Sequence, residues 1–188
     1  MKDPIRLFAA TALCLVLAMP AAAADQFEPA GPPRTFDFDT PDGHFLDDDT
    51  PVTCPINAVR GTVRFMRYGQ ATTTYVPGFN IILLRDAKPA KRFVSMSFHA
   101  RNFHPPFAVA LRSASIAAIA AVKAFHDAVG ADGVVTFLVS WSADGEVAGT
   151  SSGESLTADI GGYPDVIELE GYSGAGTATY EFGHEATE

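Results

Sequence analysis

A serine, a group of glutamates and two histidines are the residues whose types and spacing could do chemistry. Residues 149–153 are Gly-Thr-Ser-Ser-Gly, a G-x-S-x-G pattern in which Ser151 would be the nucleophile, and Asp165 and His184 follow in the chain order of the α/β-hydrolases. The pattern works only between a strand and a helix, which strain and expose the serine. The residues after it are typical of a strand or loop. The sequence therefore favours a flexible loop, with a hydrolase that uses Ser151, Asp165 and His184 as the alternative.

Glu168, Glu170 and Glu181 suggest a different chemistry. Two carboxyl groups about 5 to 9.5 Å apart can act as the acid and base of a glycosidase. Glu168 and Glu170 alternate along an expected strand and therefore share one of its faces. Alternating polar residues also mark the solvent face of a half-buried strand. The pattern thus fits either carboxylate catalysis or an exposed sheet face.

The segment "SFHARNFHPPF", residues 97–107, contains two histidines that could ligate a metal. His99 falls on the polar face of an alternating strand, whereas His104 lies past that strand, where two prolines turn the chain. Arg101 between them would repel a cation. The sequence therefore predicts no metal site here, and it makes His99 and Arg101 candidate ligand-binding residues.

The acidic segment at residues 25–50 invites a calcium interpretation, because hard cations prefer clustered oxygens. Asp37 and Asp39 fit the first two ligand positions of an EF-hand loop, but Pro41 occupies the third and Asp42 the position that requires glycine. We therefore expect no metal and no cofactor. A looser calcium site at Asp37, Asp39, Asp42 and the aspartate run 47–49 is the alternative.

Charge is distributed unevenly along the chain. The formal net charge is −9, which argues against nucleic-acid binding. Residues 51–112 hold nine basic residues and one acid, whereas residues 25–50 and 113–188 are strongly acidic. The basic stretch predicts a binding surface for an anionic ligand or an acidic protein, and its candidate residues are Arg60, Arg64, Arg101 and His99. The alternative is internal balance, in which the basic strands pair with the acidic segments.

The first 24 residues are typical of an export signal, with a basic start, an apolar run and small residues before the expected cleavage after Ala24. We predict a periplasmic or extracellular protein with no transmembrane segment. Residues 25–50 would form an extended acidic leader, and residues 51–188 a single domain. Cys54, the one cysteine left after cleavage, cannot form an intramolecular disulfide, and we expect it to be buried.

Strands must position these side chains. Short β-branched or aromatic runs between turn residues predict strands at 60–68, 79–86, 91–101, 133–142, 166–172 and 177–182. Residues 143–145 and 173–176 predict hairpin turns. Apolar residues at helical spacing, ending at Gly130, predict one α-helix over about 114–129.

The chain is therefore expected to be mainly β, as an antiparallel β-sandwich or open barrel with that helix packed against it, or else to be α+β. The prediction for function is an exported domain that binds or scaffolds. A small secreted hydrolase that uses Ser151 or the paired glutamates is the alternative.

Overall fold

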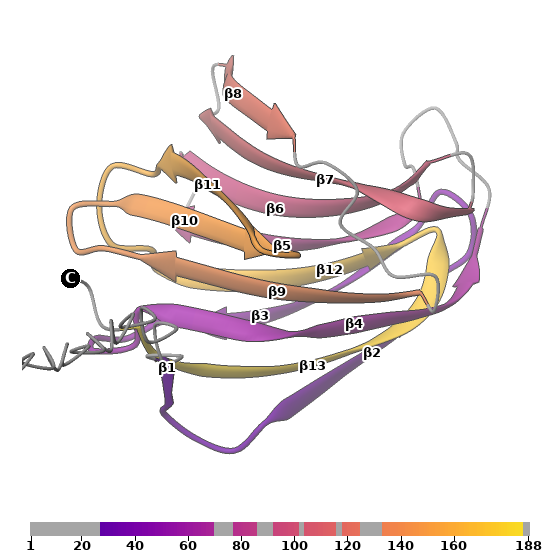
Figure 1. Ribbon diagram of the computed structural model, residues 1–188, viewed down its shortest axis with the longest axis horizontal. Helices are drawn as coiled ribbons and strands as arrows, with labels where there is room; N and C mark the ends of the chain where they lie inside the picture. Colours follow the sequence, from indigo (N-terminus) through magenta and orange to yellow (C-terminus); the bar gives the residue numbers. More distant parts are fainter. Residues whose placement is uncertain are drawn as a thin grey trace, which may run out of the picture.

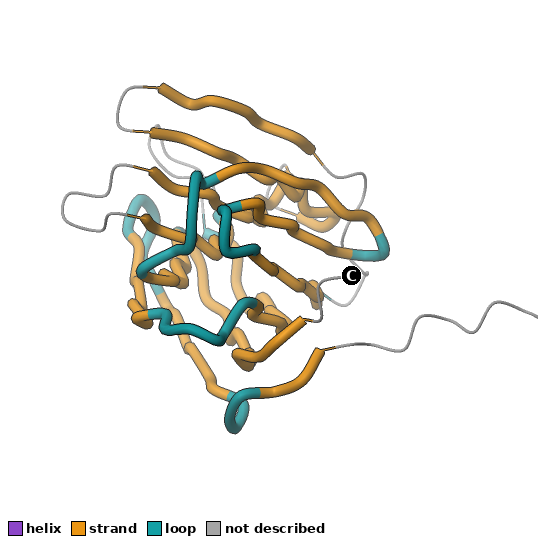
Figure 2. Tube along the Cα trace, turned by 90° about the vertical axis from the view of Figure 1, so that its left-hand side faces the viewer, coloured by secondary structure: helices purple, strands orange, loops and turns teal. Residues whose placement is uncertain are grey.

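The computed structural model describes residues 27–69, 77–85, 92–101, 104–115, 118–124 and 133–185. These residues form β-strands and no helix (Figure 2), and they include no helix that could cross a membrane. The strands, in chain order, are β1 (Phe27–Pro29), β2 (Arg34–Asp39), β3 (Phe45–Pro51), β4 (Ala58–Tyr68), β5 (Gly78–Arg85), β6 (Arg92–Arg101), β7 (His104–Ser115), β8 (Ala118–Ala124), β9 (Val134–Trp141), β10 (Glu146–Ser151), β11 (Glu154–Asp159), β12 (Val166–Tyr172) and β13 (Gly174–Glu185).

The strands form two antiparallel sheets packed as a sandwich, with sheet A in front of sheet B in Figure 1. Sheet A has seven strands in the order β1-β13-β4-β9-β10-β11, and β2 also pairs with β13. Sheet B has six strands in the order β3-β12-β5-β6-β7-β8. The predicted antiparallel β-sandwich is confirmed.

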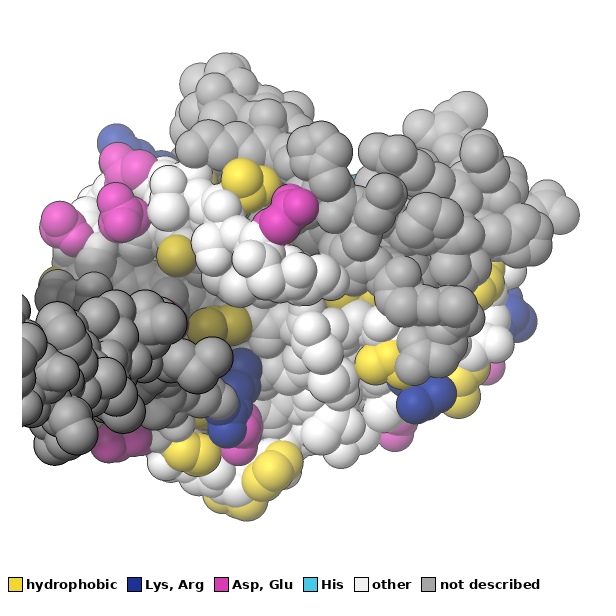
Figure 3. Space-filling view, in the orientation of Figure 1, with side chains coloured by type: hydrophobic (Ala, Val, Ile, Leu, Met, Phe, Trp, Pro, Cys, Tyr) yellow, Lys and Arg dark blue, Asp and Glu magenta, His cyan; other side chains and the backbone are white. Residues whose placement is uncertain are grey.

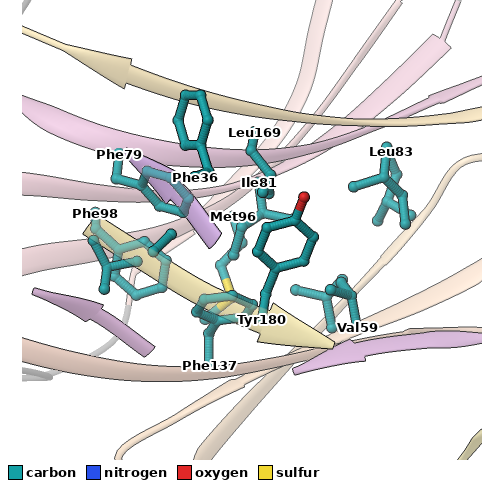
Figure 4. Packing of buried hydrophobic residues seen from close by; sticks show 14 of the residues in the cluster. Phe36, Val59, Phe79, Ile81, Leu83, Met96, Phe98, Phe137, Leu169 and Tyr180 are labelled. Atoms are coloured by element: carbon teal, nitrogen blue, oxygen red, sulfur yellow. The ribbon is translucent and has the colours of Figure 1, made fainter. Parts of the chain in front are cut away.

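Alternation along the strands builds the core between the sheets. Every second residue of β5 and β6 is an apolar side chain with no exposed surface, as expected when one face of each strand is buried. Phe79 lies near the middle of this core, with ring-centroid distances between 5.9 and 6.5 Å to Phe36, Phe38, Phe98 and Phe137. Figure 4 shows side chains from both sheets pointing toward one another in this layer.

The predicted helix over residues 114–129 is wrong where the structure describes it. β7 continues to Ser115, and β8 pairs with it antiparallel, with Ala114 opposite Ile119. Alanine favours a helix over other ordinary residue types by less than about 1 kcal/mol per residue. Pairing with a neighbouring strand overrides a preference of that size. Residues 116–117 and 125–129 of the predicted helix lie outside the described ranges.

The predicted hairpin across residues 173–176 is also wrong. β12 pairs with β3 and β5 in sheet B, whereas β13 pairs with β1, β2 and β4 in sheet A. The chain changes sheets at Ser173, a fully buried residue with φ of 48°. Its Oγ accepts a hydrogen bond of 2.9 Å from the Gly43 N–H. By contrast, the turn predicted at residues 143–145 does join two paired strands, β9 and β10.

The acidic segment between residues 27 and 51 supplies three strands. β1 and β2 pair with β13 in sheet A, and β3 pairs with β12 at the edge of sheet B. Phe36 and Phe38 of β2 enter the core. Cys54, in the loop after β3, is exposed rather than buried as we predicted. The predicted export signal lies outside the described residues.

Candidate functional site

The side of sheet B that faces away from the core carries polar and acidic side chains, and we call it the outer face of sheet B. Along β12, buried core residues alternate with Glu168, Glu170 and Tyr172 on this face. The strand register places Glu170 between Asp47 of β3 and Asn80 of β5. The described polar and aromatic side chains of this face are Phe45, Asp47, Asp49, Asn80, Ser95, Ser97, His99, Glu168, Glu170 and Tyr172.

A chain of hydrogen bonds links four of these side chains across three adjacent strands. The Asn80 Nδ2–H donates to Glu170 Oε2 at 2.6 Å, and the Tyr172 hydroxyl donates to Asn80 Oδ1 at 3.2 Å. His99 Nδ1 lies 2.9 Å from the Tyr172 hydroxyl oxygen. Because the single hydroxyl proton is given to Asn80, this contact requires a proton on His99 Nδ1. The network therefore fixes the orientation of each donor and acceptor that it contains.

Gly78 makes room for this network. It lies opposite Tyr172 on one side and His99 on the other in the strand register. A Cβ at position 78 would lie 2.9 Å from the Tyr172 hydroxyl oxygen and 2.2 Å from the Phe98 carbonyl oxygen. Glycine is thus the residue that lets the Tyr172 ring cross β5 and reach β6.

The two glutamates of β12 have different surroundings. Half-burial raises the pKa of Glu168 to about 7, with further increases from the nearby carboxylates of Asp49, Glu170 and Asp47. Burial also raises the pKa of Glu170, while the hydrogen bond from Asn80 opposes this effect. Glu168 therefore holds a proton near neutral pH more readily than an ordinary glutamate.

Strand β3 forms the rim of the outer face of sheet B. Asp47 and Asp49 lie opposite Glu170 and Glu168, and Phe45 lies opposite Tyr172. The Phe45 side chain is 48% exposed, which makes it one of the largest exposed apolar side chains in the described part of the chain. The rim thus combines an accessible aromatic ring with carboxylate acceptors.

The predicted serine triad is not brought together. The buried Ser151 Oγ donates to the Thr136 carbonyl oxygen at 2.8 Å, and His184 Nδ1 lies 2.8 Å from the Pro55 carbonyl oxygen. β4 and β9 separate the strands that carry these two residues, so three strand spacings, roughly 14 Å, lie between them. Asp165 precedes β12 in the other sheet. The geometry does not support nucleophilic catalysis by Ser151.

The predicted basic binding residues are divided between the two sheets. Arg60 and Arg64 alternate with core residues of β4 and lie on the outer side of sheet A, whereas His99 lies on the outer face of sheet B. The Arg60 Nε donates to Glu181 Oε1 at 2.6 Å, and its guanidinium carbon lies 4.1 Å from the centre of the Phe27 ring. Arg101 belongs to β6, but its side chain lies outside the described atoms, as does that of His104.

The acidic residues predicted as an alternative calcium site already contact protein donors. The Thr177 hydroxyl donates to Asp37 Oδ1 at 2.6 Å, and Arg67 Nη2 donates to Asp39 Oδ1 at 2.5 Å. Asp42 lies in the loop between β2 and β3. Within the described ranges, no three histidine, cysteine, aspartate or glutamate side chains are grouped as metal ligands.

Sequence reasoning missed Asn80 and Tyr172, and it considered Asp47 only as a ligand of the alternative calcium site, not as a neighbour of Glu170. A local signal existed for two of them: Asn80 is the one polar residue within the apolar run 79–84, and Tyr172 follows Glu170 at the same-face interval of two residues. Asp47 had no such signal. It reaches Glu170 only because β3 pairs with β12, two segments far apart in the chain.

No known protein family and no curated protein matches this sequence. Solved structures do share the fold. A native glycosidic hydrolase superposes with a TM-score of 0.51 at 7% identity and covers 87% of this chain and 83% of its own. The ancestral congerin Con-anc superposes with a TM-score of 0.51 at 6% identity, and the match covers 72% of this chain and 98% of the congerin chain. The Caenorhabditis elegans galectin LEC-6 superposes with a TM-score of 0.48 at 17% identity, and the match covers 79% of this chain and 96% of the galectin chain. At these identities the two superpositions with a TM-score of 0.51 show a shared β-sandwich fold and nothing more.

Proposed function

We propose that this protein is an exported domain that binds a saccharide on the outer face of sheet B. The hydrogen-bonded chain from Glu170 through Asn80 and Tyr172 to His99 is the observation that carries the proposal. It fixes donors and acceptors on a rigid sheet, with the buried Tyr172 holding Asn80 and His99 in place and the exposed Phe45 ring at the rim. Sugars offer matching chemistry, since their hydroxyls both donate and accept and their ring C–H groups pack on aromatic faces.

The carboxylates strengthen such binding. Hydrogen bonds from a sugar hydroxyl to an ionised carboxylate are about twice as strong as neutral ones. Asp47, Asp49 and Glu170 lie on neighbouring strands and can accept such bonds from successive hydroxyls. Because the network holds the Asn80 and Tyr172 side chains in place before a ligand arrives, binding costs less side-chain entropy.

The binding proposal is tested by titrating the protein with neutral oligosaccharides, such as cellopentaose and laminaripentaose, in a calorimeter. Replacing Tyr172→Phe removes one hydroxyl and should weaken binding about tenfold. Tyr163→Phe, which removes a hydroxyl bonded to the Ile56 carbonyl away from this face, is the matched control. Equal affinity of the wild type and Tyr172→Phe, or no heat of binding with any neutral oligosaccharide, would contradict the proposal.

A second function, hydrolysis of a glycosidic bond, is favoured by the different protonation of the two glutamates. Glu168, with a pKa of about 7, can donate its proton to the glycosidic oxygen as the bond to the anomeric carbon breaks. The Glu170 carboxylate can take a proton from the water that attacks this carbon. Cα atoms two residues apart on a strand are about 6.6 Å apart, so two carboxyl groups on the same face can lie within the roughly 5 to 9.5 Å that glycosidases use.

Hydrolysis and binding are separated by one substitution. Glu168→Gln should abolish release of reducing ends from a neutral polysaccharide while saccharide binding persists, because glutamine cannot donate the required proton. The control is Glu146→Gln on β10 of the other sheet, which should retain full activity. Release of reducing ends at the wild-type rate by Glu168→Gln would rule out this mechanism.

The sequence also predicts an anionic ligand or acidic partner at the basic strands. Its support is the positive charge of residues 51–112, but Arg60 and Arg64 lie on the opposite side of the sandwich from His99. A single ligand would therefore contact only part of the set. Oligogalacturonate is a suitable anionic probe. Its binding should weaken in Arg64→Ser and with added salt if the basic strands recognise it.

A further inference from the structure

The outer side of sheet A contains a groove that the proposed function does not use. Its volume is about 400 Å³, within the range of small-molecule sites. Its lining combines the hydroxyl-bearing Thr62, Thr136 and Thr179 with the Arg60–Glu181 ion pair and Pro33. Figure 3 shows this side of the molecule, where uncharged polar side chains and backbone make up the white middle of the surface. The groove is on the opposite side of the sandwich from Glu168 and Tyr172.

The threonines of the groove are aligned across the sheet. Thr179 of β13 lies opposite Thr62 of β4, which in turn lies opposite Thr136 of β9, and Thr35 of β2 extends the row on the other side of Thr179. All four side chains are exposed. Their strands are about 4.8 Å apart, so the row presents hydroxyls at a regular interval. A ligand with hydroxyl groups repeated along an extended chain can bond several of them at once.

The Arg60–Glu181 ion pair determines whether the groove favours a charged or an uncharged ligand. Arg60 Nε lies 2.6 Å from Glu181 Oε1, one row along the sheet from the threonines. The Arg60 guanidinium also stacks on Phe27 at the end of the groove. Because the two charges neutralise each other, a charged ligand gains little net attraction there. An uncharged ligand can still accept or donate charge-assisted hydrogen bonds at the pair.

The groove is rigid before any ligand binds. Threonine is β-branched and has few side-chain rotamers in a strand. The backbone below the row belongs to three adjacent strands of one sheet. Beneath it, a Cβ at Gly61 would lie 2.3 Å from the Thr179 carbonyl oxygen, so β4 and β13 pack closely at this point. Binding therefore costs little conformational entropy.

We infer that this groove is a second saccharide-binding site, which takes an uncharged oligosaccharide lying across β13, β4 and β9. It is independent of the outer face of sheet B, and each site can exist without the other. The protein would then present saccharide-binding surfaces on opposite sides of the sandwich, and so could connect two glycan chains.

The test follows the methyl resonances of isotope-labelled threonines by NMR during titration with cellopentaose and laminaripentaose. The resonances of Thr62, Thr136 and Thr179 should shift saturably with at least one of these neutral probes. The double variant Thr62→Val, Thr136→Val should bind that probe at least tenfold more weakly, as followed at Thr179, because it loses two hydroxyl partners. Valine is as compatible with a strand as threonine, so the variant should keep its fold.

Two controls separate this site from the first. Thr150→Val, on the same side of sheet A but outside the groove, should leave the affinity at the groove unchanged. Tyr172→Phe, on the other sheet, should leave the groove shifts unchanged whether or not the outer face of sheet B binds saccharide. The inference is overturned if neither neutral probe shifts the groove threonines at millimolar concentration, if the double variant binds as tightly as the wild type, or if only oligogalacturonate or a peptide produces the shifts.

Discussion

On the outer side of sheet A, the Glu181 carboxylate lies 2.6 Å from the guanidinium of Arg60, whereas on the outer face of sheet B Glu168 has carboxylates as its charged neighbours. The first arrangement is neutral and mutually stabilising. In the second, burial raises the pKa of Glu168, and the uncompensated negative charge of the neighbouring carboxylates raises it further. Proteins tolerate uncompensated charge mainly where it serves binding or catalysis. The difference supports the proposal that the principal site lies on sheet B, whereas the ion pair on sheet A is neutral overall.

The largest expected effect comes from the core that both sheets share. Replacing Phe79→Ala removes a ring in contact with Phe36, Phe38, Phe98 and Phe137 and should lower the free energy of unfolding by about 3–5 kcal/mol. Chemical denaturation measures the loss. Both faces should lose ligand binding together at temperatures where the variant unfolds. A change below about 1 kcal/mol would mean that the core is not packed as described.

Glu168→Gln should have an effect that depends on pH. The folded-state pKa of Glu168 is about 7, above its ordinary value of 4.5, so the folded protein binds more protons than the unfolded chain between these values. Wild-type stability is therefore highest on the acidic side and falls as pH rises from about 5 to 8. Since Glu168 is only partly buried and solvent screens its interactions, we expect the fall to be about 1–2 kcal/mol.

Unfolding by urea at pH 5 and pH 8 measures this difference. The Glu168→Gln variant should lose most of the pH dependence, because glutamine does not titrate. The control is Glu146→Gln on sheet A, which should keep the wild-type pH profile. If the wild type is equally stable at both pH values, the environment of Glu168 on sheet B does not differ from that of the ion-paired Glu181 on sheet A in the way described.

Arg60→Met should destabilise sheet A by about 1 kcal/mol, because it removes the ion pair with Glu181 and the cation–π contact with Phe27 but keeps an apolar stem. Added salt should affect the stability of the two sheets in opposite directions. Added salt weakens the attraction on sheet A and also the repulsion on sheet B, so it should destabilise the first and stabilise the second. Thermal unfolding of Arg60→Met and Glu168→Gln across a salt series should show opposite changes relative to the wild type.

The smallest effect is expected at the exposed pair of Arg67 and Asp39. The side chains are 47% and 79% exposed, so solvent screens their attraction. Arg67→Ala should change the free energy of unfolding by less than about 0.5 kcal/mol. A loss as large as that of Arg60→Met would show that exposure does not determine how much such pairs contribute.

Alternation of residue types and short β-branched or aromatic runs predicted six of the strands, because both are local properties of the chain: β4, β5, β6, β9, β12 and β13. The helix at 114–129 failed because weak helical preference competed with pairing to β7, which no local pattern reveals. The hairpin at 173–176 failed for a related reason. Its glycines suit a turn, but the partners of β12 and β13 are set by the two sheets and not by the connection between them.

The candidate site could be predicted in part. The shared face of Glu168 and Glu170 follows from their spacing, and His99 was identified from the alternation of β6. The network that joins them needed Asn80 and Tyr172 at matching register positions. The raised pKa of Glu168 comes first from burial in the folded sheet and then from nearby carboxylates, including Asp49 and Asp47 of another strand. Such features arise from pairing between distant segments, which composition and spacing do not encode.

Strand β3 has a consequence for self-association. Among the described strands it is an edge of sheet B and pairs there only with β12, and it carries three aspartates in succession at positions 47–49. An open edge is a template for adding a strand from another molecule. At neutral pH two such edges repel each other through these charges. Replacing these aspartates by asparagine should remove this barrier and favour growth of sheets between molecules.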